Sequence, residues 1–312
     1  MEGTRSRGRQ RSVLMPRYFH LFLFALFPVL LAAQHHPDSL DRRRLRTTLI
    51  AQGTFFAGGM TYLYTNWYLD RERVPFHFYQ DAAGYKQVDK VGHAYGAYLE
   101  SYAGYRSLRW SGVPKGRALL YGGGLGLFLQ TPIEVFDGLY EGWGFSWSDM
   151  AANAFGAGLV IGQEALFDEQ IVRMKFSFAR SEYARNGFGY LGDTFLESLL
   201  EDYNGHTYWL SVGVNRILPT SKLPPWLNVA VGYGAGGLYG EFENRSFYRG
   251  HRLPDAPRHR QFYLSLDVDW TKIPVRSRLL RGLFEGLNFI KIPFPALEYN
   301  TAFGWRGHGV YF

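Results

Sequence analysis

Two apolar stretches of this chain, both rich in glycine and alanine, contain ionisable side chains, and this combination restricts the fold more than any other feature. The first stretch includes the motif from Asp89 to His93, and the second runs from Pro132 to Ala157. An ionisable group is costly to bury unless it meets a partner. We therefore expect the polar residues of the two stretches to meet one another: Asp89, Lys90, His93, Glu134, Asp137, Asp149 and Asn153.

Helical spacing predicts where these residues meet. A first helix is expected over residues 49–69, either of membrane length or buried, and a second helix begins near Asp89. The third spans about residues 115–136, and the fourth starts at an N-cap serine, Ser146 or Ser148. In an up-and-down bundle the start of the second helix, the end of the third and the start of the fourth lie at the same end. Small residues that permit close helix approach include Gly156, Gly158 and Gly162.

From about residue 171 the hydrophobic period changes from helical to two. In residues 260–270, for example, Leu264 and Leu266 alternate with Ser265 and Asp267. Such strands match either a half-buried antiparallel sheet or the wall of an outer-membrane barrel. Strands are expected near residues 172–180, 206–217, 226–237, 260–271, 289–292 and 296–304, with an amphipathic helix over 275–289. The predicted class is α+β: an N-terminal bundle of about four helices followed by a C-terminal antiparallel β-sheet or partial β-barrel.

Composition narrows the class of protein. The chain is 46% hydrophobic and 18% aromatic, which favours contact with a membrane interface over an aromatic-rich soluble sandwich. The net charge of +7 includes +4 from residues 1–33, so +3 remains, and no nucleic-acid motif accompanies it. The absence of cysteine excludes disulfides, thiolate metal sites and a lipid-modified N-terminal cysteine.

The first residues have the pattern of an export signal. A basic segment precedes an apolar run over residues 21–33, which ends in Ala32 and Ala33 before a polar stretch. This pattern predicts a signal peptide over residues 1–33 cleaved near Ala33 or Gln34, with an uncleaved anchor as the alternative and Met15 as an alternative start. The expected domains are the helical part, 40–170, and the β-rich part, 171–312. We expect export to the outer membrane or the periplasmic face of a Gram-negative envelope.

Several motifs resemble known families. Asp89-Lys90-x-x-His93, Glu134-x-x-Asp137 and the run from Gly144 to Ala157 resemble the YfiM-like family of predicted bacterial envelope lipoproteins. The same order of motifs is similar to the VanZ family of small membrane proteins. The segment 201–211 resembles one found in longer Bacteroidetes-type members of the first family. Neither resemblance implies an established reaction.

Two hypotheses follow for the polar cluster. In the first, the cluster is a buried network that fixes the packing of the helices, and the protein is a structural or binding component of the envelope. In the second, His93, Glu134 and Asp149 are catalytic residues of a membrane-surface hydrolase or transferase acting on a lipid-linked substrate, with a divalent metal as an option and no other cofactor. Asp89, Lys90, Asp137 and Asn153 are the accompanying binding residues. The expected partner is a membrane or envelope lipid, not a nucleic acid.

Overall fold

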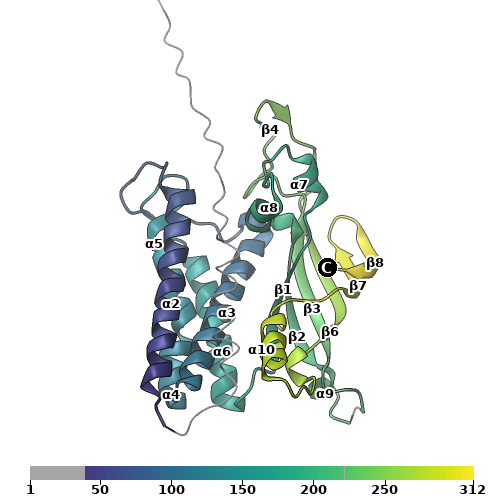
Figure 1. The fold of residues 1–312 in the computed structure, drawn as a ribbon. Coiled ribbons are helices and arrows are strands. Elements are labelled where there is room, and N and C mark those ends of the chain that lie inside the picture. The colour runs from purple at the N-terminus through teal and green to yellow at the C-terminus, as the bar shows by residue number, and fades with distance from the viewer. Residues whose placement is uncertain (1–38, 221) are drawn as a thin grey trace, which may run out of the picture.

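A computed structural model describes residues 39–220 and 222–312 of the chain. The predicted signal peptide, its cleavage site and the alternative start at Met15 lie outside these residues. The described chain forms a helical half and a sheet half that lie side by side (Figure 1). The α+β class predicted from the sequence is confirmed.

The helical half contains the expected helices with shifted ends. Helix α2, Arg42–Leu63, continues into a π-helical turn, η1, Tyr64–Tyr68. Helix α3, Val88–Trp110, follows a 3-10 turn, η2, Gly84–Gln87. The predicted third helix is divided into three elements: α4, Lys115–Arg117; η3, Ala118–Gly123; and α5, Leu125–Asp137. The predicted fourth helix is α6, Trp147–Phe167. None of the helices in the described part of the chain has both the length and the apolar character needed to cross a bilayer.

Close contact between helices depends on several glycines, two of which are Gly126 of α5 and Gly156 of α6. A Cβ on Gly126 would lie 2.1 Å from the carbonyl oxygen of Ala97, and one on Gly156 would lie 2.0 Å from that of Ala94. Both carbonyls belong to α3, so the backbones of α5 and α6 approach α3 at these positions. The predicted packing role is wrong for Gly158 and Gly162, because both face open space.

The sheet half is one antiparallel sheet of six strands in the order β1-β2-β3-β6-β7-β8. The strands span Val172–Phe178, His206–Gly213, Leu227–Gly236, His259–Val268, Phe294–Asn300 and Gly304–Tyr311. Three predicted strands differ. Residues Val214–Ile217 form a helical turn, α9; residues 289–292 contribute a single bridge from Ile290 to Phe176; and 296–304 is the first arm of the β7–β8 hairpin.

Short elements surround the sheet. The expected amphipathic helix is α10, Arg278–Leu287. The sequence patterns did not predict α7, Glu182–Asn186, or α8, Phe195–Glu201, which carries a capping box at Thr194. The remaining elements are η4, Tyr203–Gly205; η5, Trp270–Lys272; and the small β4–β5 hairpin, Phe247–Tyr248 and His251–Arg252.

The two faces of the sheet are reversed relative to a sheet that packs an apolar core. Ser265 and Asp267 of β6 are buried, whereas the alternate residues of the same strand, Leu264 and Leu266, are exposed. The inward face buries a charged pair, in which Lys175 Nζ lies 2.7 Å from Asp267 Oδ2. The polar face of these strands is therefore the interior one.

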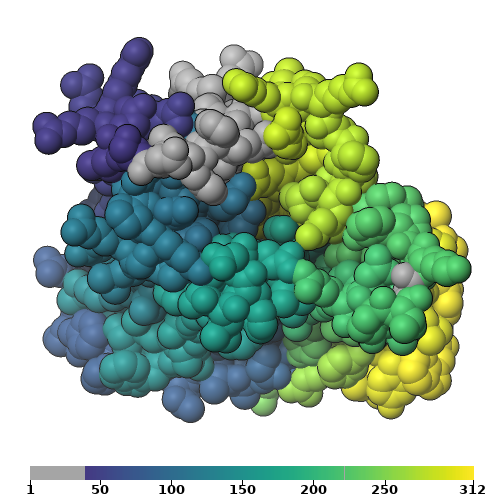
Figure 2. Space-filling model, turned by 90° about the horizontal axis from the view of Figure 1, so that it is seen from below, coloured from purple at the N-terminus to yellow at the C-terminus, as the bar shows by residue number. Residues whose placement is uncertain are grey.

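Helix α3 joins the two halves. The ring of Tyr95 lies 5.8 Å from those of Phe176 and Tyr208, and its hydroxyl donates to the carbonyl of Phe289. Further along α3, the Tyr102 hydroxyl donates to Glu285 of α10. Seen from below, the teal surface of the helical half abuts the green surface of the sheet half (Figure 2). This contact places the N-terminal part of α3 beside the sheet.

Candidate functional site

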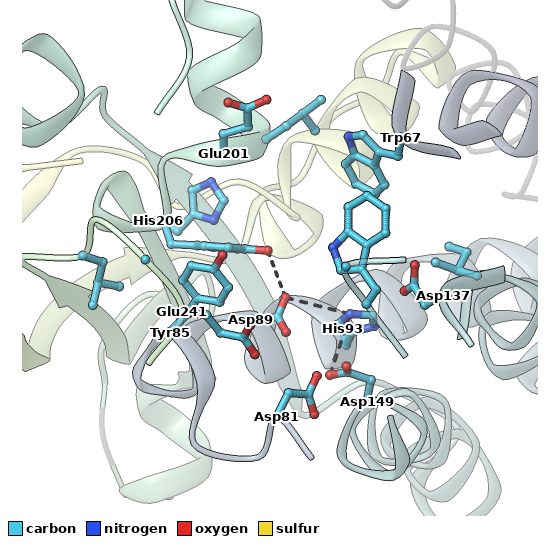
Figure 3. A pocket seen from close by; sticks show the side chains of 18 of the residues that line it. Trp67, Asp81, Tyr85, Asp89, His93, Asp137, Asp149, Glu201, His206 and Glu241 are labelled. Carbon is cyan, nitrogen blue, oxygen red and sulfur yellow. Dashed lines mark hydrogen bonds and ion pairs between the residues drawn. The ribbon is translucent and has the colours of Figure 1, made fainter. Parts of the chain in front are cut away.

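His93 lies between the acidic residues that were predicted from the sequence to surround it. Its Nδ1 is 3.6 Å from Glu134 Oε1 of α5, and its Nε2 is 3.7 Å from Asp149 Oδ1 of α6. Asp89, one turn earlier on α3, lies 3.9 Å from the same Nε2. Figure 3 shows the imidazole between Asp89 and Asp149. The predicted convergence of the two polar stretches is therefore confirmed.

Lys90 supplies the positive charge of the cluster. Its Nζ lies 2.6 Å from Asp81 Oδ2, 2.7 Å from Asp149 Oδ1 and 3.0 Å from Asp89 Oδ2. Burial acts to lower the pKa of Lys90, but the neighbouring carboxylates outweigh it and raise the pKa. One lysine thus faces three carboxylates, and the cluster has an excess of acid.

Ser146 connects the start of α6 to the cluster. Its hydroxyl accepts the amide N–H of Asp149, as the predicted N-cap requires, and donates to Asp81 Oδ1 at 2.6 Å. Its own amide N–H donates to Glu134 Oε2. Burial acts to raise the pKa of Asp81, but hydrogen bonds from Lys90, Ser146 and Ser148 lower it to about 2. Sequence reasoning missed Asp81, which lies in a loop without a motif.

Burial raises the pKa of the other acids. The pKa of Glu134 rises to about 9, first because of burial and then because Asp149 and Asp137 are near. Burial likewise raises the pKa of Asp149 and of Asp137 to about 6. Asp137 accepts a hydrogen bond of 2.6 Å from the hydroxyl of Tyr68, so the structure directs this predicted residue toward η1.

Several buried polar atoms of the cluster have no hydrogen-bond partner within the described residues. They include both side-chain amide atoms of Asn153, Nδ1 of His93 and Oε1 of Glu134. Asn153 is 0% exposed and Glu134 is 1% exposed, so bulk water does not reach them. Buried polar groups are normally paired, and unpaired ones mark strain or function.

The cluster forms one wall of a pocket of about 1400 Å³ between the two halves. From the sheet half come Tyr203, whose hydroxyl donates to Asp89 Oδ1 at 2.9 Å, and Glu241, which accepts from the hydroxyl of Tyr79. Tyr203 lies in the segment 201–211 that the sequence had singled out, although its role was not predicted. Figure 3 shows Glu201 and His206 on the side of the pocket opposite Asp149, with Trp67 above His93.

Asp89, His93 and Asp149 offer one ligand atom each within 4.8 Å of one another, a set that suits a metal ion. An ion bound there would compete with Lys90 Nζ for Asp149 Oδ1. The metal option of the sequence analysis therefore stays a prediction.

Comparison with known proteins finds a family model that is similar to part of the helical half. Residues 78–163 match the family model described as Predicted periplasmic lipoprotein (DUF2279). This match indicates an exported protein of the cell envelope. It covers Asp81, Lys90, His93, Glu134 and Asp149. The match therefore includes the polar cluster, while Trp67 and the sheet wall of the pocket lie outside it. No curated protein and no solved structure shows significant similarity to the chain.

Proposed function

We propose that this protein is an outer-membrane-associated binding protein of the envelope, and that its pocket takes the ammonium-bearing headgroup of an envelope lipid. The observation that carries the proposal is the acid excess of the pocket. Eight carboxylate residues and two arginines line it, and Lys90 adds one further cation behind the wall. An anionic ligand would be repelled by this wall, whereas an ammonium group would be attracted.

The aromatic lining supports the same ligand class. Rings of Trp67, Tyr85, Tyr95, Tyr203 and Tyr208 border the space. An ammonium group is attracted to the face of an aromatic ring, and rings combined with carboxylates are a recurrent way to bind it. The apolar body of the rings also suits the glycerol and upper chain carbons of a lipid.

Asp89 provides the test of binding. Asp89→Asn removes a pocket carboxylate charge and keeps the shape, and Asp255→Asn alters an exposed carboxylate outside the pocket. Calorimetry with short-chain phosphatidylethanolamine should show about tenfold weaker binding for Asp89→Asn, corresponding to about 1.4 kcal/mol, and no change for Asp255→Asn. Equal affinity of the wild type for phosphatidylethanolamine and phosphatidylglycerol would contradict the proposed ligand.

A second candidate function, hydrolysis of a lipid-linked substrate, is favoured by the unpaired atoms of His93 and Glu134. Their Nδ1 and Oε1 atoms lie 3.6 Å apart and have no hydrogen-bond partner within the described chain. Because the pKa of Glu134 is raised to about 9, its carboxyl holds a proton at neutral pH. In this candidate His93, which lines the pocket, is the general base, and the buried Glu134 orients its imidazole.

This candidate predicts separable losses. His93→Ala should abolish release of headgroup from a lipid substrate while the variant still binds the lipid, and His251→Ala, which alters an exposed histidine, should retain turnover. A wild type that binds phosphatidylethanolamine but releases no product from it, in the presence or absence of divalent ions, would rule out hydrolysis of this lipid and leave the binding function standing.

A further inference from the structure

The outward face of the sheet is apolar in three adjacent rows of cross-strand neighbours. In the central row, Leu210, Val231, Leu264 and Leu297 are paired in register across β2, β3, β6 and β7. All four side chains are at least 37% exposed. A second aliphatic row, with Val229 opposite Leu266, lies on one side of it.

A row of aromatic residues borders the aliphatic rows on the other side. It crosses all six strands in register, and its members are Phe176, Tyr208, Tyr233, Phe262, Tyr299 and Trp305. At the β8 end Trp305 is 70% exposed and its ring lies 5.0 Å from that of Tyr299. Rings therefore lie at one level of the sheet, and aliphatic side chains fill the level next to it.

From this banding we propose that the outward face of β3, β6, β7 and β8 contacts the hydrocarbon of a bilayer, with the aromatic row at the level of the lipid headgroups. Tyrosine and tryptophan concentrate where the hydrocarbon meets water, and aliphatic side chains suit the chains below. An aliphatic band bordered by aromatic residues is typical of strands that face lipid. This inference rests on the membrane association proposed above and specifies the surface that makes it.

The opposite face of the same strands shows why water is a poor solvent for the outward face. The inward positions hold buried polar and charged groups, among them Lys175 paired with Asp267, and His308 paired with Glu298. A sheet exposed to water on one side normally presents polar residues to that side. Here the polar side chains are enclosed and the aliphatic ones are outside, which is the arrangement a lipid solvent favours.

The aromatic row also connects the surface to the pocket. Its first two members, Phe176 and Tyr208, line the pocket, while its last members are on the outward face. Both belong to the same row of the sheet, so the pocket wall lies at the headgroup level of the proposed orientation. A headgroup would then reach the carboxylates without leaving the membrane surface.

The test compares two phenylalanines in the full chain. Phe262→Glu places a charge in the aromatic row, and Phe247→Glu places the same charge on the exposed β4–β5 hairpin. Flotation with vesicles of phosphatidylethanolamine and phosphatidylglycerol should recover at least fivefold less of Phe262→Glu than of the wild type, and an unchanged fraction of Phe247→Glu. Brominated acyl chains should quench wild-type tryptophan fluorescence more than that of Trp305→Phe.

The other outcomes separate the two proposals. If wild type and Phe262→Glu float equally, the assignment of this face is wrong and membrane association stands. If sedimentation shows a wild-type dimer that Phe262→Glu dissociates, with flotation unchanged, the face is a contact between two copies and the inference is overturned. If wild type does not float, the membrane association fails as well, and calorimetry with short-chain phosphatidylethanolamine then decides the pocket independently. Retained binding of that lipid by Phe262→Glu shows that the variant is folded.

Discussion

Two of the places in which the molecule buries charge differ in balance and surroundings. Inside the sheet, Lys175 and Asp267 are each 0% exposed and form a one-to-one pair 2.7 Å apart. At the end of the helical half, Lys90 faces three carboxylates beside a pocket, and His93 and Glu134 carry unpaired atoms. The first arrangement balances one positive charge with one negative charge, whereas the second has acid in excess.

This difference separates a structural pair from a candidate site. A buried pair contributes little net stability, but removal of one partner leaves an uncompensated charge in a medium of low dielectric. A cluster next to a pocket can recruit water or a ligand when one member is lost. The size of the stability loss on substitution therefore reports which kind of site a charged residue belongs to.

Lys175 should show the largest effect. Lys175→Met strands Asp267 inside the sheet and is expected to cost about 3–5 kcal/mol in the free energy of unfolding, measured with urea. The exposed pair of Lys272 with Glu169 gives the control, since Lys272→Met should cost less than about 1 kcal/mol. A loss for Lys175→Met no greater than that of the control would mean that water reaches the sheet interior.

Lys90→Met should lower the free energy of unfolding by less than Lys175→Met does, about 2 kcal/mol at pH 7, because the pocket admits water to the carboxylates left behind. Asp81 has a folded pKa of about 2, below its ordinary value, so its contribution is present above pH 4 and lost as the pH falls toward 2. The difference between wild type and variant should therefore shrink on acidification in this range. Lys115→Met, in an exposed pair with Asp168, is the control for the loss of one lysine charge.

A third comparison concerns the backbone contact that brings the cluster together. Gly156→Ala would drive a methyl group against the carbonyl of Ala94, and we expect a loss of about 1–3 kcal/mol together with weaker lipid binding. Gly158→Ala meets no atom within 4 Å and should stabilise α6 by up to about 1 kcal/mol. Thermal unfolding of the two variants measures both. Equal stability of the two would mean that α3 and α6 are not in close contact.

Sequence patterns predicted the helical side of the site well because the interactions that form it depend on short stretches of sequence. The cost of burying Asp89, His93 and Glu134 and the N-cap chemistry of Ser146 are properties of short stretches, and bundle topology then brings the helix ends together. Asp81 was missed because it lies in a loop, where no periodic pattern fixes the direction of a side chain.

The sheet side shows the limit of pattern reasoning. Alternation predicted the strands but did not show which face is interior, since Leu264 and Ser265 alternate equally well in either orientation. The hydroxyl of Tyr203 reaches Asp89 across the interface between the halves, a contact between residues 114 positions apart. Contacts of this kind depend on how the halves dock, which local periodicity does not encode.

The last comparison concerns Glu134, and its expected effect is a dependence on pH. The folded pKa of about 9 lies above the ordinary value of 4.5, so stability contributed by the protonated carboxyl is complete below pH 4.5 and is lost as the pH rises toward 9. Glu134→Gln keeps the neutral shape without a titrating proton. We therefore expect the free energy of unfolding of the variant to rise relative to that of the wild type as the pH rises, by at least about 1 kcal/mol at pH 8.

Glu243→Gln, at an exposed position of the pocket rim, is the control for the loss of one carboxylate charge. Urea unfolding from pH 5 to pH 8 measures both variants. A difference for Glu134→Gln that does not change with pH would show that Glu134 is ionised at neutral pH in the folded protein. An ionised Glu134 would add one more negative charge to a cluster in which acid is already in excess, and would strengthen its attraction for a cationic ligand.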